Sequence, residues 1–400
     1  MSVTLDIQEV GVRGDGVAEQ GGRRYFVPFS LPGETVEAKP RDERSGGIVA
    51  DLVEVLAPSR HRVTPPCRHF GVCGNCALQH WRLDAYAGWK TDLIARALSQ
   101  QGVRAPVFDP MLQGVPNERR RADFIVRGKL AGFHERGSHR AFNVEECHVL
   151  RPALRELLPT LRAILPGNVA ADAIVNETDS GLDVLLRPHR RFDLSLEANQ
   201  KLVAFAHAAG LARLSWGDRS SPEPIAALRT PRLAFGEVSV DPPPGVFLQA
   251  TRRAEQTMRA AVAHWLSGAK KVADLFAGIG ALTLGQPFRS TLFESDKPAV
   301  DAVAKWGGVR RDLFRNPLLA SDLKPFDAVV LDPPRAGAAA QVAELAKSNI
   351  GRVTYASCDP GTFARDAKVL QNAGYRLEKL MPIDQFLWSV HVELIALFVK

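Results

Sequence analysis

Acidic residues and a glycine turn in the last third of the chain have the types and spacing of a nucleoside site. The run VADLFAGIG, residues 272–280, is an apolar strand that ends in an acid and a tight glycine turn. Gly278 and Gly280 permit positive φ and let a ligand approach the backbone. Glu294 ends the next strand, where a carboxylate can accept hydrogen bonds from both hydroxyls of a ribose. The helix-like stretch Ala281–Leu284 lacks the third glycine of dinucleotide sites, so the pattern favours S-adenosylmethionine (SAM) over a dinucleotide or a purely structural turn.

Two further strand candidates end in residues that could act on a ligand. Asp332 follows an apolar run and precedes two prolines, which fix a rigid loop at the carboxyl end of the strand. Cys358 ends the run YASC. A lone cysteine is usually a buried packing residue. At a strand end beside a methyl donor, however, a thiolate could act as a nucleophile.

The alternation of strands and helices after about residue 245 predicts a doubly wound α/β sheet, which binds ligands at the carboxyl ends of its strands. The strand candidates are Lys271–Phe276, Thr291–Glu294, Phe326–Leu331, Arg352–Ser357, Leu377–Ile383 and His391–Val399. The helix candidates are Thr251–Leu266, Pro298–Trp306, Ala338–Lys347 and Thr362–Ala373.

The rest of the chain predicts two other domains. Residues 1–57 are β-rich segments separated by glycine turns, a pattern typical of a small β-barrel. Their strand candidates are Val3–Val10, Arg24–Phe29, Glu34–Lys39 and Ile48–Leu56. Residues 58–235 mix short strands with helices at Arg151–Ile164 and Leu196–Ala209. An amphipathic helix within residues 84–102 is expected to pack on the last domain, residues 236–400.

Charge and composition limit the classes of protein. The apolar share of 46% and the charged share of 24% exclude wholesale disorder. The net charge of +7 permits a polyanionic partner, and Glu118–Arg140 alone carries seven Lys or Arg against three acids. That stretch is either a solvated strand face or a phosphate-facing patch. No window is apolar enough to span a membrane and no secretory signal begins the chain, so a cytoplasmic protein is expected.

The motifs DLFAGIG, LDPPR, SCDP and His391-Val392-Glu393 together resemble the RNA uracil-C5 methyltransferase family, which makes 5-methyluridine. Gly14–Glu34 resembles a TRAM domain, an RNA-binding barrel of OB type. Residues 60–82 resemble the family's iron–sulfur segment, and residues 132–150 resemble the strand pair that brings the fourth cysteine ligand. The resemblance implies a multidomain fold, with an N-terminal OB-like barrel, a central α+β domain carrying a four-cysteine cluster, and a C-terminal Rossmann-like SAM-dependent methyltransferase domain.

The resemblance divides the five cysteines into four ligands and one nucleophile. The implied cluster ligands are Cys67, Cys73, Cys76 and Cys147. Their spacing alone suits a structural zinc ion as well as a [4Fe–4S] cluster, and the resemblance favours the cluster. Four thiolates would fill the cluster and leave no iron open for SAM. The cluster is therefore expected to be structural or to orient RNA.

The remaining cysteine, Cys358, matches the family's nucleophile, which attacks C6 of uracil so that C5 can accept a methyl group. Glu393 matches the base that then removes the C5 proton. The thiol's ordinary pKa leaves little thiolate at neutral pH, so the pocket is expected to favour the anion or a base to assist. The implied SAM contacts are Gln249, Phe276, Gly278, Gly280, Glu294 and Asp332, with Asp312 a weaker candidate.

The sequence departs from the family at three positions. Ala281 and Asp359 each stand where relatives often have asparagine, and Asn75 replaces a glycine between two cluster cysteines.

A TRAM domain with cluster cysteines is typical of the branch acting on 23S rRNA, whose target base must be flipped out of its stack. The expected partner is therefore RNA. No obligate protein partner and no membrane association are expected, and the enzyme is expected to be a monomer.

Three alternatives stay open beside this interpretation. A tRNA uridine C5-methyltransferase shares the reaction but belongs to a branch that typically lacks both the TRAM domain and the cluster. A cytosine-C5 RNA methyltransferase would usually show a second motif cysteine, and the resemblance assigns all the others to the cluster. A non-catalytic RNA-binding iron–sulfur protein would be expected to lack Cys358 or Glu393, and both are present.

Overall fold

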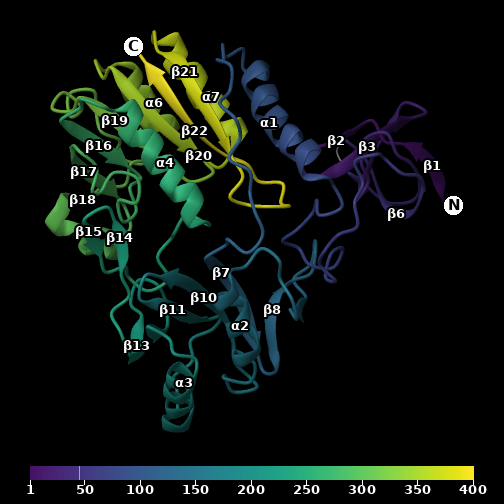
Figure 1. Cartoon of the computed structure of the whole chain (residues 1–400), viewed down its shortest axis with the longest axis horizontal. Helices are drawn as coiled ribbons and strands as arrows, with labels where there is room; N and C mark the ends of the chain where they lie inside the picture. The colour runs from purple at the N-terminus through teal and green to yellow at the C-terminus, as the bar shows by residue number, and fades with distance from the viewer. Residues whose placement is uncertain (45) are drawn as a thin grey trace.

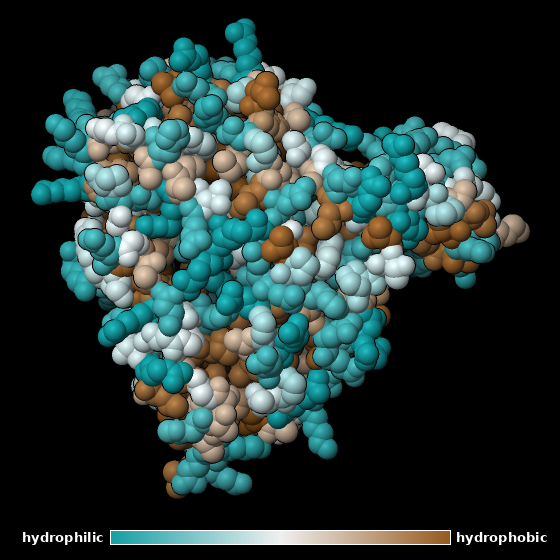
Figure 2. Space-filling model, in the orientation of Figure 1, coloured by the Kyte–Doolittle hydropathy of each residue, from teal (hydrophilic) through white to brown (hydrophobic). Residues whose placement is uncertain are grey.

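The computed structural model describes residues 1–44 and 46–400, which form three large sheets and one small hairpin. Figure 1 shows the first sheet as a lobe at the right of the view, and the central sheet below the C-terminal sheet. The lobe also projects from the rest of the molecule in the space-filling view (Figure 2). Among the described residues, no helix is both long and apolar enough to cross a membrane.

The N-terminal sheet has six strands in the order β1-β5-β6-β4-β3-β2. They are β1 (Val3–Asp6), β2 (Glu9–Val10), β3 (Asp15–Gln20), β4 (Arg23–Pro28), β5 (Thr35–Arg44) and β6 (Gly47–Ala57). The continuous run of residues 3–10 pairs with β5 through β1 and with β3 through β2, so the sheet closes on itself. Strand β3 was not predicted, because Gly16 lies inside it rather than in a turn. A Cβ at Gly16 would come within 2.1 Å of the Ser30 hydroxyl, which explains the glycine.

Residues 60–82, which contain Cys67, Cys73 and Cys76, are called the cysteine segment below. Helix α1 (Leu83–Gln100) follows this segment and packs against α7 and β21 of the C-terminal half. Its Ile94 and Leu98 are buried in the core of that half. The fully buried Lys90 ammonium pairs with Asp384 over 2.6 Å and donates to the carbonyl of Phe386 over 3.1 Å. This helix therefore fixes the loop that follows β21.

The central sheet has seven strands in the order β13-β12-β11-β10-β7-β8-β9. They are β7 (Arg121–Arg127), β8 (Leu130–His134), β9 (Ala141–Asn143), β10 (Ala170–Thr178), β11 (Gly181–Pro188), β12 (Arg213–Trp216) and β13 (Glu223–Ala227). Helices α2 (Pro152–Thr160) and α3 (Leu196–Ala208) share one hydrophobic core with it. Leu387 and Trp388, from the loop after β21, complete that core and join the central sheet to the C-terminal half.

The C-terminal sheet confirms the predicted doubly wound arrangement, with the order β18-β17-β16-β19-β20-β22-β21. Its strands are β16 (Lys271–Leu275), β17 (Arg289–Glu294), β18 (Gly308–Arg310), β19 (Ala328–Leu331), β20 (Arg352–Ser357), β21 (Arg376–Ile383) and β22 (Glu393–Val399). Only β22 runs antiparallel to its neighbours. Central β16 lies between β17 and β19, where the strand order reverses and ligands bind in such folds.

Helices cover both faces of this sheet because its strands are apolar on both sides. They are α4 (Arg252–Trp265), α5 (Lys297–Ala302), α6 (Ala339–Ala346) and α7 (Pro360–Asn372). In β19, Val329 and Leu331 face the core shared with α1, α6 and α7, whereas Ala328 and Val330 face α4. This two-sided burial is the expected pattern of a parallel sheet.

Two expectations about the C-terminal half need correction. Residues Ala281–Leu284 form turns and not a helix, although Leu284 N–H does donate to the Gly280 carbonyl over 2.9 Å. The expected boundary at residue 235 falls within a hairpin, because β14 (Leu233–Phe235) pairs with β15 (Val238–Val240). This hairpin packs with Leu284 and Leu292 of the C-terminal half. It lies with that half and not with the central sheet.

Candidate active site and cysteine cavity

The turn after β16 has a backbone suited to a close ligand. Gly278 and Gly280 have φ of 54° and 76°, and a Cβ at Gly280 would come within 2.5 Å of the Leu292 side chain. Phe276 also has a positive φ of 61°, and its ring centroid lies 5.2 Å from that of Phe314. A non-glycine residue rarely adopts this conformation. The turn therefore holds Phe276 and the glycines in a fixed, open arrangement.

Glu294, at the end of β17, is held toward this turn. Its Oε2 accepts from Gly278 N–H over 3.0 Å, and its Oε1 accepts from the N–H groups of Ser295 and Asp296 over 2.6 and 2.9 Å. Because each carboxylate oxygen has two lone pairs, Oε2 can still accept one more hydrogen bond. The two predicted parts of the nucleoside site, the turn and the acid, are thus brought together.

Two more carboxylates lie behind the turn. Asp274 is fully enclosed in β16, and its Oδ2 accepts from the Thr283 hydroxyl over 2.5 Å. Burial, and then the charges of Asp332 and Glu294, raise the pKa of Asp274 to about 7. Asp332 keeps part of its surface exposed, yet desolvation raises its pKa to about 7 as well. No role of Asp274 could be predicted from the sequence, because a single acid in an apolar strand does not show which ligand it faces.

Two side-chain amides, Gln249 and Gln385, join Asp332 to Glu393, and we call them the amide relay. Gln249 Nε2 donates to Asp332 Oδ2 over 2.9 Å. Gln385 Nε2 donates to Gln249 Oε1 over 2.8 Å and to Glu393 Oε2 over 2.6 Å. Gln385 Oε1 accepts from Ala250 N–H over 2.8 Å, which fixes the orientation of that amide. The relay places the predicted cofactor acid and the predicted base in one network.

Gln385 was missed by the sequence analysis. It lies in the loop after β21, where Lys90 binds its neighbours Asp384 and Phe386. The signal that could have found it is the run of polar residues Asp384-Gln385 directly after an apolar strand. A loop position alone, however, does not tell which side chain points inward.

Glu393 begins β22 and is buried. Burial raises its pKa to about 7, with the charge of Asp332 adding to the shift, whereas the Gln385 hydrogen bond and the positive charges of Lys90 and Arg335 oppose it. A carboxyl with this pKa is present in both protonation states near neutral pH, which suits a group that takes up a proton.

Cys358 lies half-buried between β20 and α7, and the next residue, Asp359, caps α7 by accepting from Thr362 N–H over 2.9 Å. Burial raises the pKa of the Cys358 thiol to about 12, and the charges of Glu393 and Asp332 add to this shift. Arg335 is the neighbour that opposes it. Burial thus opposes the first half of the expectation, that the pocket itself favours the thiolate, and assistance by a base stays a prediction.

Arg335 is itself positioned by His391. Its Nη2 lies 2.8 Å from Nε2 and 3.0 Å from Nδ1 of the imidazole. Burial, and then the charge of Arg335, lower the pKa of His391 to about 4, so the ring is neutral and can accept. This pair places a guanidinium beside the cysteine at an exposed rim.

The basic stretch Glu118–Arg140 does not form one surface. Arg120 is buried, where it pairs with Glu255 over 2.5 Å and donates to the carbonyl of Gln249 over 3.1 Å. Arg136 pairs with Asp15 of the N-terminal sheet over 2.6 Å. The stretch therefore mixes residues that join parts of the fold with residues that remain available to a ligand.

The four other cysteines line one cavity, together with apolar side chains that include Phe70 and Phe133. All four thiols are free. Burial raises the pKa of each, to about 11 for Cys73 and about 12 for Cys76. Within residues 1–44 and 46–400, no three His, Cys, Asp or Glu side chains gather closely enough to hold a single metal ion. The structure thus brings the predicted cysteines together around a space, not around one point.

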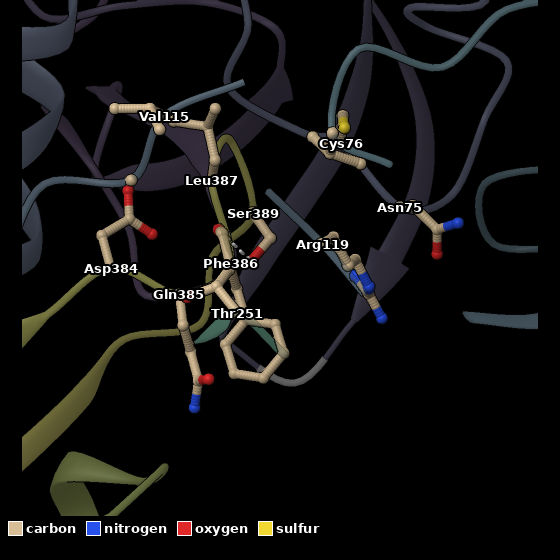
Figure 3. Close-up of a pocket in the computed structure, with 12 residues that line it drawn as sticks. Asn75, Cys76, Val115, Arg119, Thr251, Asp384, Gln385, Phe386, Leu387 and Ser389 are labelled. Atoms are coloured by element: carbon tan, nitrogen blue, oxygen red, sulfur yellow. Dashed lines mark hydrogen bonds between the residues drawn. The ribbon is translucent and has the colours of Figure 1, made fainter. Parts of the chain in front are cut away.

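The cysteine segment is bonded directly to the loop that carries the amide relay. The carbonyl of Trp388 accepts from the N–H groups of Ala77 and Leu78 over 2.9 and 3.0 Å. Cys76 and residues of this loop also line a narrow shared pocket, which Figure 3 shows with Gln385 turned away from the cysteine. The two candidate sites are therefore neighbours in space.

Comparisons with known proteins agree with this geometry. Residues 309–400 match the family described as tRNA (Uracil-5-)-methyltransferase. The chain is 40% identical to an "Uncharacterized RNA methyltransferase" of Brucella suis, over 99% of this chain and 97% of that protein. It is 34% identical to the 23S rRNA (uracil(1939)-C(5))-methyltransferase RlmD of Halomonas elongata, over 97% of this chain and 88% of that protein.

A solved structure gives the same fold. The Pyrococcus abyssi tRNA (uracil-54, C5)-methyltransferase, in complex with S-adenosyl-L-homocysteine, aligns with a TM-score of 0.78 and 22% identity over 99% of both chains. The sequence relatives cover nearly the whole chain, and the fold has the doubly wound sheet that SAM-dependent methyltransferases use. The chain belongs to the family of SAM-dependent RNA (uracil-C5)-methyltransferases.

Proposed function

We propose that the chain methylates C5 of one specific uridine of 23S rRNA, with Cys358 as nucleophile and Glu393 as base. The observation that carries this proposal is the meeting of Cys358, Glu393 and Asp332 at one rim, close enough that the two carboxylates raise the pKa of the thiol. The choice of 23S rRNA is supported by the Halomonas relative, whose name gives that substrate. The four-cysteine cavity and the closed N-terminal sheet support it further.

The first step is attack of the Cys358 sulfur on C6 of the flipped-out uracil. Uracil C5 is too weak a nucleophile to take a methyl group directly, and the new S–C6 bond makes C5 enolate-like. The thiol must give up its proton to water before this attack, and its pKa of about 12 opposes the loss. Arg335, held by His391, is the group of the chain that favours the thiolate.

The last step is removal of the C5 proton by Glu393, followed by elimination that breaks the S–C6 bond and frees the cysteine. Gln385 donates a hydrogen bond to Glu393 and so favours its ionised form, which is the form that accepts a proton. SAM, when bound, supplies the methyl group from its sulfonium.

The residues proposed to hold SAM line the switch point of the sheet. Glu294 would accept from one ribose hydroxyl with its remaining lone pair, beside the open turn at Gly278 and Gly280. Phe276 would pack at the mouth of this turn. Gln249 and Asp332 would face the methionine part, because the amide relay fixes them between the turn and Glu393.

We also propose that Cys67, Cys73, Cys76 and Cys147 hold a [4Fe–4S] cluster. The donor set of four free thiols that line one cavity fits such a group, in which each iron takes one thiolate. A zinc ion needs its sulfur ligands at about 2.3 Å from one point. The cluster would be structural and would orient RNA, with no part in the chemical step.

The closed sheet of residues 1–57 is proposed to be an RNA-binding TRAM-like barrel, and residues 58–232 the domain that presents RNA to the catalytic half. Arg136 ties the two by its ion pair with Asp15. Both would bind parts of the RNA away from the target uridine.

Mass mapping of 5-methyluridine in rRNA and tRNA from a strain lacking the gene tests this function. We expect one position in 23S rRNA to lose its methyl group, and tRNA to stay unchanged. Loss of a tRNA 5-methyluridine instead would favour the other branch, to which the name of the Pyrococcus structure belongs. An unchanged pattern in both RNAs would overturn the proposal.

A further inference from the structure

A second cavity of about 250 Å³ opens beside the active-site rim, between the central sheet and the C-terminal half. Its lining includes Asn75, Arg119, Arg121, Asp123, Phe247 and Phe386. None of these residues has a part in the proposed methyl transfer. Figure 2 shows hydrophilic side chains across the middle of the face seen there, between these two parts of the molecule.

The cavity carries two pairs of an arginine with an aromatic ring. The guanidinium of Arg121 lies 5.0 Å from the ring centroid of Phe247, and that of Arg119 lies 5.8 Å from the ring centroid of Phe386. Phe247 is 56% exposed, so its ring is accessible to a ligand in the cavity. Flat aromatic and guanidinium surfaces of this kind are what nucleobases stack on.

The positive charge in the cavity is only partly neutralised. Among the described residues, no carboxylate lies within ion-pair distance of Arg119, which uses its Nε to donate to the carbonyl of Arg121 over 3.0 Å. Arg121 pairs with Asp123 at 3.6 Å, and its buried Nε has no partner in the described part of the chain. Cations left without counterions in a cleft attract phosphate.

Asn75 adds a group that can distinguish one base from another. It is exposed in the loop between Cys73 and Cys76, where Gly74 N–H donates to the His134 carbonyl over 3.0 Å. Figure 3 shows its amide turned away from Cys76. No hydrogen bond of this amide is found within the described residues, so both its donor and its acceptor are available. An asparagine side chain can pair with two atoms on one base edge.

The position of the cavity relates it to the target uridine. Phe386 is the next residue after Gln385, and Phe247 lies two residues before Gln249, so the aromatic rings adjoin the two amides of the relay in the chain. A nucleotide bound on these rings would lie directly beside the uridine in the active site. Glycine, the residue that Asn75 replaces in the resemblance, offers no side chain to read it.

Building on the proposed function, we propose that this cavity binds the base of a nucleotide neighbouring the target uridine, and that Asn75 reads its edge and so sets the sequence context of methylation. Phe247 and Phe386 provide the stacking surface, and Arg119 and Arg121 hold the adjoining phosphate. The cysteine loop would thereby contribute to substrate choice through one side chain.

A pool of short RNAs tests this inference, each with one 5-fluorouridine between random nucleotides. Glu393 can remove a proton from C5 but not fluorine, so reacted RNA stays bonded to Cys358 and can be sequenced. With SAM present, we expect the wild type to enrich one base at one flanking position by about fivefold or more. Asn75→Gly should lose this enrichment.

Two further variants keep the test decisive. Asn75→Asp keeps the size of the side chain but removes its donors, and should shift the enrichment to another base. Asn349→Gly, an exposed asparagine of a distant loop, should leave it unchanged. An adduct without flanking preference, or one whose preference survives in Asn75→Gly and Asn75→Asp, overturns the inference and leaves the proposed function standing. Absence of any adduct in the wild type overturns both.

Discussion

The active-site rim and the cysteine cavity are neighbours, but different forces hold them together. At the rim, the functional carboxylates are fixed by hydrogen bonds of the chain itself, as in the amide relay from Asp332 to Glu393. In the cavity, four free thiols face an enclosed space without bonding one another. The carboxylates of the rim are thus held by the chain itself, whereas the cysteine segment would be held by the proposed cluster.

The two regions are nevertheless connected through one loop. Trp388 accepts two backbone hydrogen bonds from the cysteine segment, and the same loop carries Gln385, which bonds Glu393. A substitution among the cysteines of the cavity should therefore alter the position of Glu393, through Trp388 and Gln385. A change at the rim should leave the cavity intact, because Cys358 and Glu393 take no part in its lining.

The largest effect is expected from Cys358→Ala at the rim. Without the sulfur no bond to C6 can form, so methylation should fall by at least about a thousandfold. Binding of SAM and of RNA should stay within about twofold, as measured by calorimetry and filter binding. Turnover close to that of the wild type would exclude Cys358 as the nucleophile.

Cys76→Ala tests the other side of the comparison. We expect the anaerobically purified variant to lose the absorbance near 400 nm that the wild type should show. Its melting temperature should fall by about 10 °C, because losing a bound group lowers the free energy of unfolding by several kcal/mol. Methylation should also decrease, through Ala77 and Trp388. Cys358→Ala is the matched control, because it removes a cysteine outside the cavity and should keep both properties. A colourless wild-type protein with one zinc per chain would contradict the cluster.

Gln385→Met tests whether the relay positions the base. The variant loses the hydrogen bonds to Glu393 and Gln249, so turnover should fall by about tenfold to a hundredfold. Loss of a donor to the ionised carboxylate should also raise the pKa of Glu393 further. The pH at which turnover increases, as Glu393 ionises, should therefore be higher than in the wild type. Gln371→Met, which removes another amide bonded at both ends, should change neither value. An unshifted pH profile in Gln385→Met would refute the positioning role.

The smallest effect concerns pH in the wild type. Glu393 accepts a proton only when ionised, and its pKa is about 7. Release of methylated RNA from a preformed adduct should therefore slow on acidification, by about tenfold per pH unit below 6.5. Starting from the adduct separates this step from ionisation of the Cys358 thiol. A release rate that stays constant from pH 6 to pH 8 would contradict this account.

Much of the site could be predicted from the sequence because parallel strands end at one edge of their sheet. Glu294 ends one such strand, Asp332 and Cys358 directly follow two others, and the structure brings these strand ends to the same edge of the sheet. The sequence alone therefore predicts that these three strand ends lie close together. The doubly wound sheet followed from the same alternation of strands and helices.

What could not be predicted depends on contacts between distant segments. Gln385 lies in a loop, and its partners Gln249 and Glu393 come from other parts of the chain. Strand β3 could not be predicted because a glycine such as Gly16 usually indicates a turn, whereas here the close Ser30 side chain requires it. The raised pKa of Cys358 results from burial and from two carboxylates that converge only in the fold.

The most direct test of the division of roles at the rim is the reaction of Glu393→Gln with SAM and 23S rRNA that lacks the modification. The account predicts a protein–RNA adduct that survives denaturation, in which mass spectrometry of the digested product finds a methylated uracil on Cys358. Replacing Cys358 with Ala in the same variant should remove the adduct. Normal release of 5-methyluridine by Glu393→Gln, or attachment of RNA to another cysteine, would contradict the account.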